Sequence, residues 1–351
     1  MDTFRRNRRL ISILEKGLAG ERIDRHEALF LLGFHEASLE AGLVRTVAQA
    51  ASRRRFHNEA LLMGQIGVST APCPGNCRFC AFGKHHTRLP ETRLTPEEVA
   101  ARARSFAGGR DLYALFLMTM HDFRFDDLLE TIAAARRAVP AHTRIVVNIG
   151  DFDASQAGEL KAAGVSGAYH VRRLREGTDT DLDPEARLST FRVIREAGLD
   201  FYCCCEPIGP EHTGEELVEQ MFLAVDFGCF QHAAMRRVYL PGSPLADRGQ
   251  ITELRLAQIV AVIALAALGR TGTQSIAVHE PNLIGLVSGA NAVYAETGAN
   301  PRDMAADTSG HRGRDMAACR TMLYEAGFTA LRRGDGTTAP LTLESVTAAM
   351  P

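Results

Sequence analysis

The feature that most constrains the fold is a regular alternation of apolar strand-like stretches with helical stretches, which runs from Leu61 to Ala326. Repeated strand–helix pairs favour parallel βα units over antiparallel sheet. The predicted strands cover residues 64–69, 113–119, 144–149, 167–170, 201–205, 237–240, 275–278 and 291–295. The helices after them are predicted to begin near Pro96, Asp126, Ser155, Pro184, Gly214, Thr252 and Pro281, and the last covers residues 314–326. Eight such pairs predict an α/β fold, a (β/α)8 TIM-type barrel with its active site at the carboxyl ends of the strands.

The remaining segments predict additions to one catalytic domain. Residues 1–60 carry apolar side chains at helical spacing, with Asp24 as a predicted N-cap. We expect an N-terminal helical cap over residues 1–60, the barrel over residues 61–330 and a C-terminal tail over residues 331–351. The apolar segment 256–269 is shorter than the roughly 20 residues that cross a bilayer, so it predicts a buried helix.

Charge and cysteine content limit the class of partner. The chain has 40 Lys and Arg against 42 Asp and Glu, which gives no electrostatic case for nucleic acid or an anionic membrane as the main partner. We expect a small-molecule substrate and a monomer or homodimer. The eight cysteines fit no small secreted disulfide framework, and no apolar signal stretch follows the N-terminal arginines. These features predict a cytoplasmic protein.

Three cysteines, Cys73, Cys77 and Cys80, follow the first predicted strand with the spacing C-x3-C-x2-C on a loop that contains Pro and Gly. Three thiolates on so short a loop can hold three corners of a metal cube and leave one iron open. A structural zinc site, by contrast, takes four ligands. The alternatives are a zinc loop completed by His85 or His86 and three ordinary buried thiols, although a Pro-Gly-Asn loop is poor core material.

This motif resembles the cluster motif of radical S-adenosylmethionine (SAM) enzymes in its spacing and in the aromatic Phe79 before the third cysteine. The resemblance implies a [4Fe–4S] cluster on the three cysteines, with SAM on the open iron and Phe79 beside the cofactor. It also implies an enzyme that accepts an electron from a donor such as flavodoxin or ferredoxin and cleaves SAM reductively. The resulting 5′-deoxyadenosyl radical would abstract hydrogen from a small substrate.

Further segments resemble the biotin synthase-like branch of these enzymes, which includes methylornithine synthase, the radical SAM maturase of [FeFe]-hydrogenase and an Fe-hydrogenase cofactor biosynthesis protein. The matching segments are residues 155–164, 186–198, 242–247 and 288–291. The resemblance implies a role in the biosynthesis of a cofactor or an amino-acid-derived metabolite.

The sequence departs from biotin synthase itself at the sulfur-donor cluster. Biotin synthases hold a second cluster with cysteines on the second, third and fifth strands plus an arginine. In this chain the second and third predicted strands have no cysteine, and the arginine position falls near Ser275. We therefore expect a rearrangement or maturation reaction. The alternatives are a sulfur-inserting synthase with an auxiliary cluster and a noncatalytic iron–sulfur protein.

Cys203, Cys204 and Cys205 are adjacent on the fifth predicted strand. Alternation on a strand sends the first and third to one face and the second to the other, so the three cannot easily bind one metal. We interpret them as small core residues, since free cysteine packs as a small apolar side chain. An auxiliary cluster or a substrate-handling thiol is the alternative.

The resemblance also implies which residues hold SAM. Arg187 matches the arginine that pairs with the SAM carboxylate, a role suited to its planar fork. Glu176 resembles the acidic residue that bonds the SAM amino group or ribose. Ile208 and Gly209 fall where the family lays backbone against the adenine. A surface arginine and a solvated charged loop are the plain alternatives.

Charged and polar residues cluster at the predicted carboxyl ends of the strands, where barrel positions are typically catalytic or binding. We expect them to form a polar cavity. The predicted catalytic residues are Glu176, Arg173, His279 and Glu280. The predicted substrate-binding residues are His121, Asn148, His170, Arg175, Glu206 and Glu296.

Overall fold

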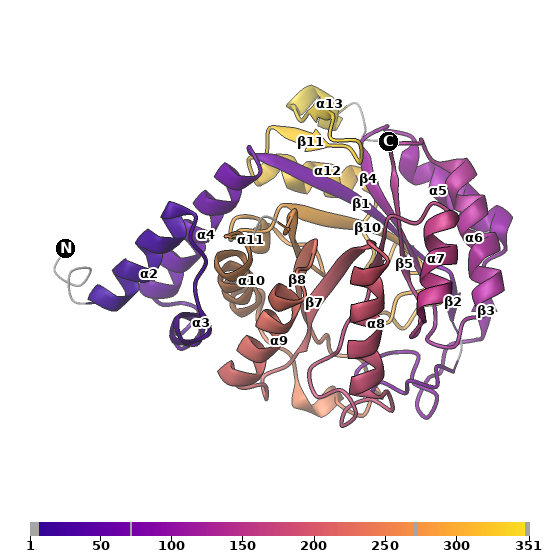
Figure 1. Ribbon diagram of the computed structural model, residues 1–351, viewed down its shortest axis with the longest axis horizontal. Coiled ribbons are helices and arrows are strands. Elements are labelled where there is room, and N and C mark those ends of the chain that lie inside the picture. Colours follow the sequence, from indigo (N-terminus) through magenta and orange to yellow (C-terminus); the bar gives the residue numbers. More distant parts are fainter. Residues whose placement is uncertain (1–6, 71, 270–271, 348–351) are drawn as a thin grey trace.

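The computed structural model describes residues 7–70, 72–269 and 272–347. Eight parallel strands form a closed barrel in the order β1-β4-β5-β6-β7-β8-β9-β10, and pairing of β10 with β1 completes the ring (Figure 1). The strands are β1 (Glu59–Gly67), β4 (Leu112–Met118), β5 (Arg144–Asn148), β6 (Gly167–Tyr169), β7 (Asp200–Ile208), β8 (Gln231–Arg236), β9 (Ser275–Val278) and β10 (Ala292–Gly298). The predicted TIM-type fold is confirmed.

Helices follow the barrel strands at the predicted places and pack around the ring (Figure 1). They are α5 (Pro96–Ala107), α6 (Phe125–Ala138), α7 (Ala154–Ala162), α8 (Pro184–Glu196), α9 (Gly214–Asp226), α10 (Glu253–Ala267), α11 (Leu283–Leu286) and α12 (Met316–Glu325). Most begin at a side-chain cap; Thr213, for example, accepts from the backbone N–H of Glu216 and forms a capping box. A 3-10 turn, η1 (Ala246–Arg248), precedes α10.

The sixth barrel strand lies earlier than predicted. We expected it over residues 237–240, but the structure forms β8 over Gln231–Arg236. Polar Gln231 and His232 concealed this strand, because a strand buried on both faces usually reads as an apolar run. Both side chains are fully buried, and Gln231 Nε2 donates to Ser275 Oγ at 2.7 Å.

Strand alternation divides the hydrophobic core into two parts. Outward side chains pack between the barrel and its helices, where α10 is buried along most of its length, as predicted for segment 256–269. Inward side chains fill the lumen with aromatic rings: the Phe116 centroid lies 5.3 Å from that of Tyr202 and 5.0 Å from that of Tyr294. This plug closes the lower lumen and leaves the carboxyl ends of the strands to form a site.

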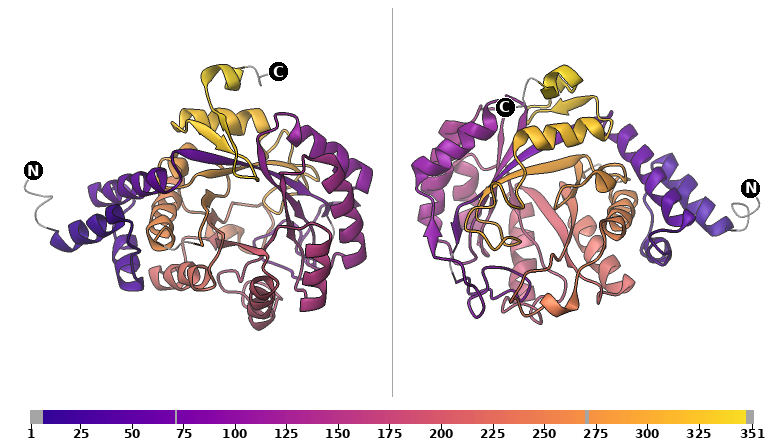
Figure 2. Two further views of the ribbon diagram at one scale, coloured as in Figure 1. Left: turned by 45° about the horizontal axis from the view of Figure 1, so that its top comes forward. Right: turned by 180° about the vertical axis from the view of Figure 1, so that it is seen from behind.

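Among the described residues before the barrel, the chain forms the helices α2 (Arg8–Ala19), α3 (Arg25–Leu32) and α4 (Leu39–Arg55). They extend from one side of the molecule and contact α9 and α10 (Figure 2). Asp24 caps α3 in a capping box with Glu27, as predicted. At the other end of the chain, β11 (Ala330–Arg332) pairs with the start of β1 and with β12 (Thr338–Pro340), and α13 (Leu343–Thr347) follows.

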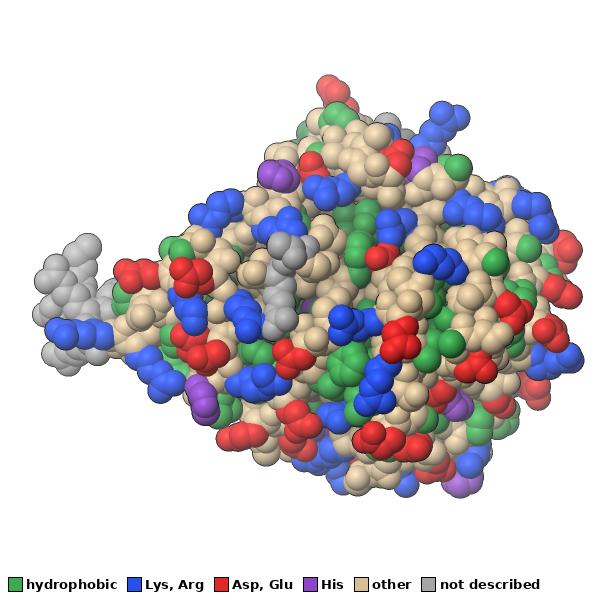
Figure 3. All heavy atoms as spheres, viewed as in Figure 1, with side chains coloured by type: hydrophobic (Ala, Val, Ile, Leu, Met, Phe, Trp, Pro, Cys, Tyr) green, Lys and Arg blue, Asp and Glu red, His purple; other side chains and the backbone are tan. Residues whose placement is uncertain are grey.

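The surface mixes both signs of charge. On the face in Figure 3, basic and acidic side chains are interspersed, with no large area of one sign. Among the described residues, no helix combines the length and apolar character that crossing a membrane requires.

Candidate active site

A cavity opens at the carboxyl ends of the barrel strands, and eight of the predicted site residues line it together. Further lining comes from the ends of β4 and β5 and from the segment after β10, including Thr119, Ile149 and Pro301. The eight predicted residues are Cys73, Cys77, Cys80, His121, Asn148, His170, Arg173 and Arg187.

The three cysteines sit on the loop between β2 (Ser69–Thr70) and β3 (Thr92–Arg93), which pair antiparallel. Backbone bonds fold the loop back on itself: Cys73 N–H donates to the Phe82 carbonyl at 2.8 Å, and Cys80 N–H donates to the Cys77 carbonyl at 3.0 Å. With these turns, Cys73, Cys77 and Cys80 all line the cavity.

Two distant segments anchor this loop. The backbone N–H of Asp181, after β6, donates to the Gly75 carbonyl at 2.9 Å. The backbone N–H of Ala81 donates to the Pro301 carbonyl, after β10, at 2.9 Å. The loop therefore spans the mouth of the barrel between β6 and β10 and does not hang free.

The neighbouring histidines support the loop. The backbone N–H of His85 donates to Asn76 Oδ1 at 3.2 Å, and the His85 ring contacts the same amide. His86 Nε2 lies 2.8 Å from the Cys80 carbonyl oxygen. Both imidazoles are thus engaged with loop groups other than the thiols.

The cysteines are free thiols without a disulfide. Burial raises the pKa of Cys77 to about 12, and burial also raises the pKa of Cys80. Bare thiols at these positions stay protonated near neutral pH, and a bound metal centre would displace the protons because thiolate is the ligand form.

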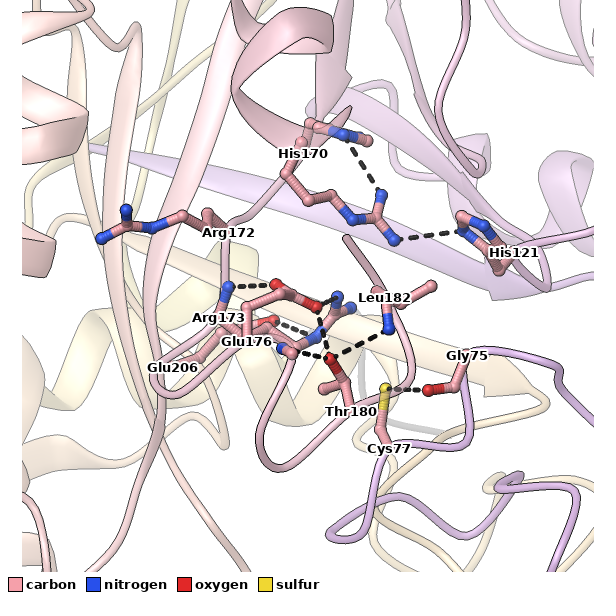
Figure 4. A network of polar contacts seen from close by, with 12 residues as sticks. Gly75, Cys77, His121, His170, Arg172, Arg173, Glu176, Thr180, Leu182 and Glu206 are labelled. Atoms are coloured by element: carbon pink, nitrogen blue, oxygen red, sulfur yellow. Dashed lines mark hydrogen bonds and ion pairs between the residues drawn. The ribbon is translucent and has the colours of Figure 1, made fainter. Parts of the chain in front are cut away.

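Arg187 of α8 reaches the cavity and joins three side chains. Its Nη1 lies 3.3 Å from Asp151 Oδ1. Its Nη1 also lies 3.2 Å from His170 Nε2, and its Nη2 lies 3.1 Å from His121 Nδ1; Figure 4 marks the contacts to these two histidines. Burial lowers the pKa of His170 to about 4. Burial raises the pKa of Asp151, but the hydrogen bond from His170 and the charge of Arg187 outweigh it and bring the value to about 2. The network is therefore a neutral imidazole, a carboxylate and a guanidinium.

Glu176 and Arg173 form a second network on the turn after β6 (Figure 4). Glu176 accepts a hydrogen bond from the backbone N–H of Arg173 and one from Thr180 Oγ1 at 3.1 Å. Arg173 Nε lies 3.6 Å from Glu206 Oε1. Burial opposes the charge of Arg173, but Cys77, Glu176 and Glu206 raise its pKa, so it stays a cation.

Glu206 and His279 lie outside the lining of this cavity and contact the lumen residues Tyr169 and Tyr294, respectively. Glu206 is 4% exposed and accepts a hydrogen bond from the Tyr169 hydroxyl. His279 Nδ1 lies 3.9 Å from Cys204 Sγ. Neither residue lines the upper cavity, yet both face the lumen.

Other predicted residues lie apart from the cavity, because stronger partners hold them. Arg175 pairs with Glu216 of α9 at 2.8 Å, away from the lumen. Glu280 pairs with Arg236 at 2.7 Å and also with Arg312. These contacts give the predicted substrate role of Arg175 and the predicted catalytic role of Glu280 no support.

Four remaining predicted residues differ in their surroundings. Glu296 is 6% exposed and pairs with Arg302, and burial raises its pKa. Ile208 packs in the outer core, because the pairing of β7 with β8 shifts register after Cys205. Gly209 lies on the following turn, and Phe79 is partly buried on the cysteine loop without lining the cavity.

Some site residues were missed by the sequence reasoning. Asp151, which orients His170 and Arg187, lies just past the end of β5, and its place after a strand was an available signal. Ser69 lines the cavity from the short strand β2, and nothing in the sequence marked it. Tyr169, which donates a hydrogen bond to Glu206, was recognised only as part of a predicted strand.

Comparison with known proteins decides the family. The family model of the radical SAM superfamily matches residues 68–254, more than half of the chain. The chain belongs to the radical SAM superfamily. As a member, it is expected to use an iron–sulfur cluster and SAM, which is consistent with three free thiols that line one cavity with Arg173 and Arg187.

Sequence and structural relatives agree with this assignment. The chain is 29% identical over 263 residues to biotin synthase of Trichlorobacter lovleyi, which covers 71% of this chain and 76% of that protein. The fold is similar to that of methylornithine synthase, with a TM-score of 0.76 and 16% identity over 90% of this chain and 96% of the other. It is also similar to HydG, a maturase of the [FeFe]-hydrogenase, with a TM-score of 0.76 and 18% identity over 92% and 75%. These proteins are similar to the chain in sequence or in fold, and the family match itself is to the radical SAM superfamily.

Two buried polar atoms show that the cavity suits a polar cofactor. Ser69 Oγ and Arg187 Nε are buried and have no hydrogen-bond partner among the described residues, and both residues line the cavity. A buried polar group left unpaired costs about 1–3 kcal/mol. The carboxylate and hydroxyl groups of SAM are of the kind that would satisfy such atoms.

Proposed function

We propose that this protein binds a [4Fe–4S] cluster through Cys73, Cys77 and Cys80 and uses SAM to start a radical reaction on a small substrate. When bound, the cluster and SAM would supply a 5′-deoxyadenosyl radical that abstracts hydrogen. The observation that carries this proposal is the convergence of the three free thiols and Arg187 on one cavity at the carboxyl ends of the strands.

Arg187 would bind the SAM carboxylate. Its guanidinium is held by Asp151, His170 and His121, so it is oriented before a ligand arrives, and its Nε remains available. A charge-assisted bond from a preoriented guanidinium costs little ordering entropy.

The Glu176 carboxylate would accept hydrogen bonds from the SAM amino group or from its ribose. Thr180 and the Arg173 backbone fix this side chain behind the cysteine loop. Ile208 and Gly209 would lie near the adenine only if the turn after β7 contributes backbone, since Ile208 itself packs in the outer core.

The substrate would occupy the lumen between this cavity and the aromatic plug. His121, Asn148, His170 and Arg173 line the upper part, and Glu206 and His279 face the lower part. Arg173 would neutralise a negative group on the substrate, and the closed barrel would exclude water and hold the reacting carbon in place.

We favour rearrangement or cofactor maturation over sulfur insertion, in the biosynthesis of a cofactor or an amino-acid-derived metabolite. Strands β4 and β5 carry no cysteine, and Ser275 stands near the position of the biotin synthase arginine and accepts from Gln231. Methylornithine synthase and HydG, a maturase of the [FeFe]-hydrogenase, share the fold, and neither name refers to sulfur insertion.

The test is reductive cleavage of SAM by the reconstituted protein under anaerobic conditions. With dithionite, or with flavodoxin or ferredoxin as the physiological type of donor, 5′-deoxyadenosine should form slowly without substrate. Candidate small carboxylates and amines should raise the rate, and product analysis would identify the reaction. No 5′-deoxyadenosine from protein with a full iron complement would refute the proposal.

A further inference from the structure

The lumen holds a second group of metal-type donor atoms, separate from the cysteine loop. Cys204 and Glu206 on β7 and His279 just after β9 place a sulfur, a carboxylate oxygen and a ring nitrogen within 4.8 Å of one another. Cys204 is fully buried, and Glu206 is 4% exposed. Cys203 and Cys205 belong to the outer core, so one thiol of the three reaches this group.

The barrel brings these side chains together through strand register. Cys204 pairs with Ala233 of β8, and Ala233 pairs with Ala277 of β9. Both alanines face the lumen and are fully buried. Because these two side chains are small, Cys204 and His279 can meet across the intervening strand.

The polar atoms of this group are incompletely satisfied. His279 Nε2 is buried and has no hydrogen-bond partner among the described residues. Within the part of the chain that the structure describes, the one hydrogen-bond-type contact of its Nδ1 is the long one of 3.9 Å to Cys204 Sγ. Buried polar atoms are normally paired. An ion between Cys204 Sγ and His279 Nδ1 would supply the strong partner that Nδ1 lacks, while Nε2 keeps none among the described residues.

We infer that Cys204, Glu206 and His279 bind one divalent metal ion of the zinc type. Thiolate, imidazole and carboxylate are the ligands that zinc takes in proteins, and three of them leave one position open to water or to a substrate atom. A tetrahedral ion would hold sulfur and nitrogen about 3.5 Å apart, so the 3.9 Å separation needs only a small closure.

Charge and protonation suit such an ion. A thiolate and a carboxylate together carry two negative charges, which a divalent ion neutralises in a buried site. Burial lowers the pKa of His279 to about 3, so its ring is neutral and can donate a lone pair. Burial, and then the charge of Glu206, raises the pKa of Cys204. Binding would therefore break the S–H bond, form a sulfur–metal bond and release the proton to solvent.

The surroundings hold the carboxylate in place. Tyr169 donates to Glu206 Oε2, and Arg173 lies 3.6 Å from Oε1. A carboxylate has about four lone pairs, so each oxygen keeps one for a metal. Groups that hydrogen-bond to a ligating carboxylate, as Tyr169 does here, are the usual outer support of a metal site.

The test uses the full chain with Cys73, Cys77 and Cys80 changed to alanine, so that the loop cannot bind metal. After treatment with a chelator under anaerobic conditions, this protein is titrated with Co²⁺ and then with Zn²⁺. We expect one Co²⁺ per chain with a thiolate-to-cobalt charge-transfer band, displaced by Zn²⁺. Because this site requires neither SAM nor an iron–sulfur cluster, its outcome is independent of the proposed function.

Single substitutions added to the same triple-alanine protein test the proposed ligands one at a time. Cys204→Ser should abolish the charge-transfer band and weaken Zn²⁺ binding at least tenfold, and His279→Gln should weaken binding similarly while the thiol remains. Cys203→Ser, the matched control, should bind like its parent. Absence of a stoichiometric site in protein folded by circular dichroism would overturn the assignment, as would unchanged binding in the folded Cys204→Ser or His279→Gln variant.

Discussion

The chain carries two groups of three cysteines, one on the loop between β2 and β3 and one on strand β7. On the loop, turns bring Cys73, Cys77 and Cys80 to one cavity wall. On the strand, the thiols are closer in sequence but diverge in space: Cys204 faces the lumen, and Cys203 and Cys205 face the helices. Proximity in sequence therefore does not decide whether thiols can share a metal.

The backbone explains the difference. A strand sends successive side chains to opposite faces, and no rotamer change brings neighbours back together. A loop with spacings of four and three can fold its thiols to one side, because its turns are set by bonds such as that from Asp181 to Gly75. The loop cysteines are thus suited to one multinuclear centre, and the strand supplies one lumen ligand and two packing residues.

The largest expected effect tests the loop. Changing Cys73, Cys77 and Cys80 together to alanine should remove essentially all of the about four irons per chain expected for one cube, because no thiolate corner remains. Formation of 5′-deoxyadenosine should also cease. Iron and sulfide assays with absorption spectra provide the measurement, and a retained [4Fe–4S] spectrum would contradict the loop assignment.

The next effect tests Arg187, which lines the same cavity as the loop cysteines. Arg187→Ala should weaken SAM binding at least about tenfold, since a charged hydrogen bond contributes about 1.5–3 kcal/mol. Arg175→Ala is a matched control, because Arg175 pairs with Glu216 away from the cavity. Equilibrium binding of SAM to reconstituted protein measures both. Equal affinity in the two variants would remove Arg187 from the SAM site.

Another effect concerns the loss of folding stability in acid, and it tests His170, which lines the cavity together with the loop cysteines. The folded-state pKa of His170 is lowered to about 4 from an ordinary value of 6.5. Between these pH values the unfolded chain binds a proton that the folded protein does not, so the free energy of unfolding falls as pH decreases through this window. The loss is on the order of 3 kcal/mol by pH 4.

Urea unfolding of the iron-free protein at pH 7 and 4.5 checks this effect. His170→Gln should lose less stability between the two values than the parent does, and the exposed His26→Gln should behave like the parent. An identical loss in His170→Gln and in the parent would show that His170 does not govern the window.

The smallest effect tests the two outward-facing cysteines of strand β7. Cys203→Ser or Cys205→Ser should leave iron near four per chain, because both thiols pack against helices. The cost is packing and polarity, about 1–3 kcal/mol for a buried hydroxyl without a good partner. Iron near six that falls to four in the variant would show an auxiliary cluster and would favour sulfur insertion.

Much of the barrel could be predicted from sequence, because its strands and helices follow local rules. The cap at Asp24 and the apolar segment of α10 could be recognised in the sequence in this way. Strand β8 was not, because its buried Gln231 and His232 look polar until Ser275 and backbone carbonyls supply their partners. A buried polar residue is visible in a sequence only when its partner is known.

The candidate site likewise contains residues that the sequence marked and residues whose role only their contacts reveal. Spacing marked the loop cysteines, and strand ends marked His121, His170 and Arg173, because parallel strands deliver their carboxyl ends to one rim. Arg175 was assigned by the same rule and lies elsewhere, since Glu216 of a neighbouring helix holds it. Asp151 and Tyr169 gain their importance only from contacts with Arg187, His170 and Glu206.

The sequence by itself determined the strand–helix repeat, the three-thiol loop and the alternation that separates Cys204 from its neighbours, because each depends on local spacing along the chain. Only the tertiary structure decided that Cys204 meets Glu206 and His279, and that Arg187 is oriented by Asp151, His170 and His121. The physical reason is barrel closure, which sets the register between strands that are far apart in sequence.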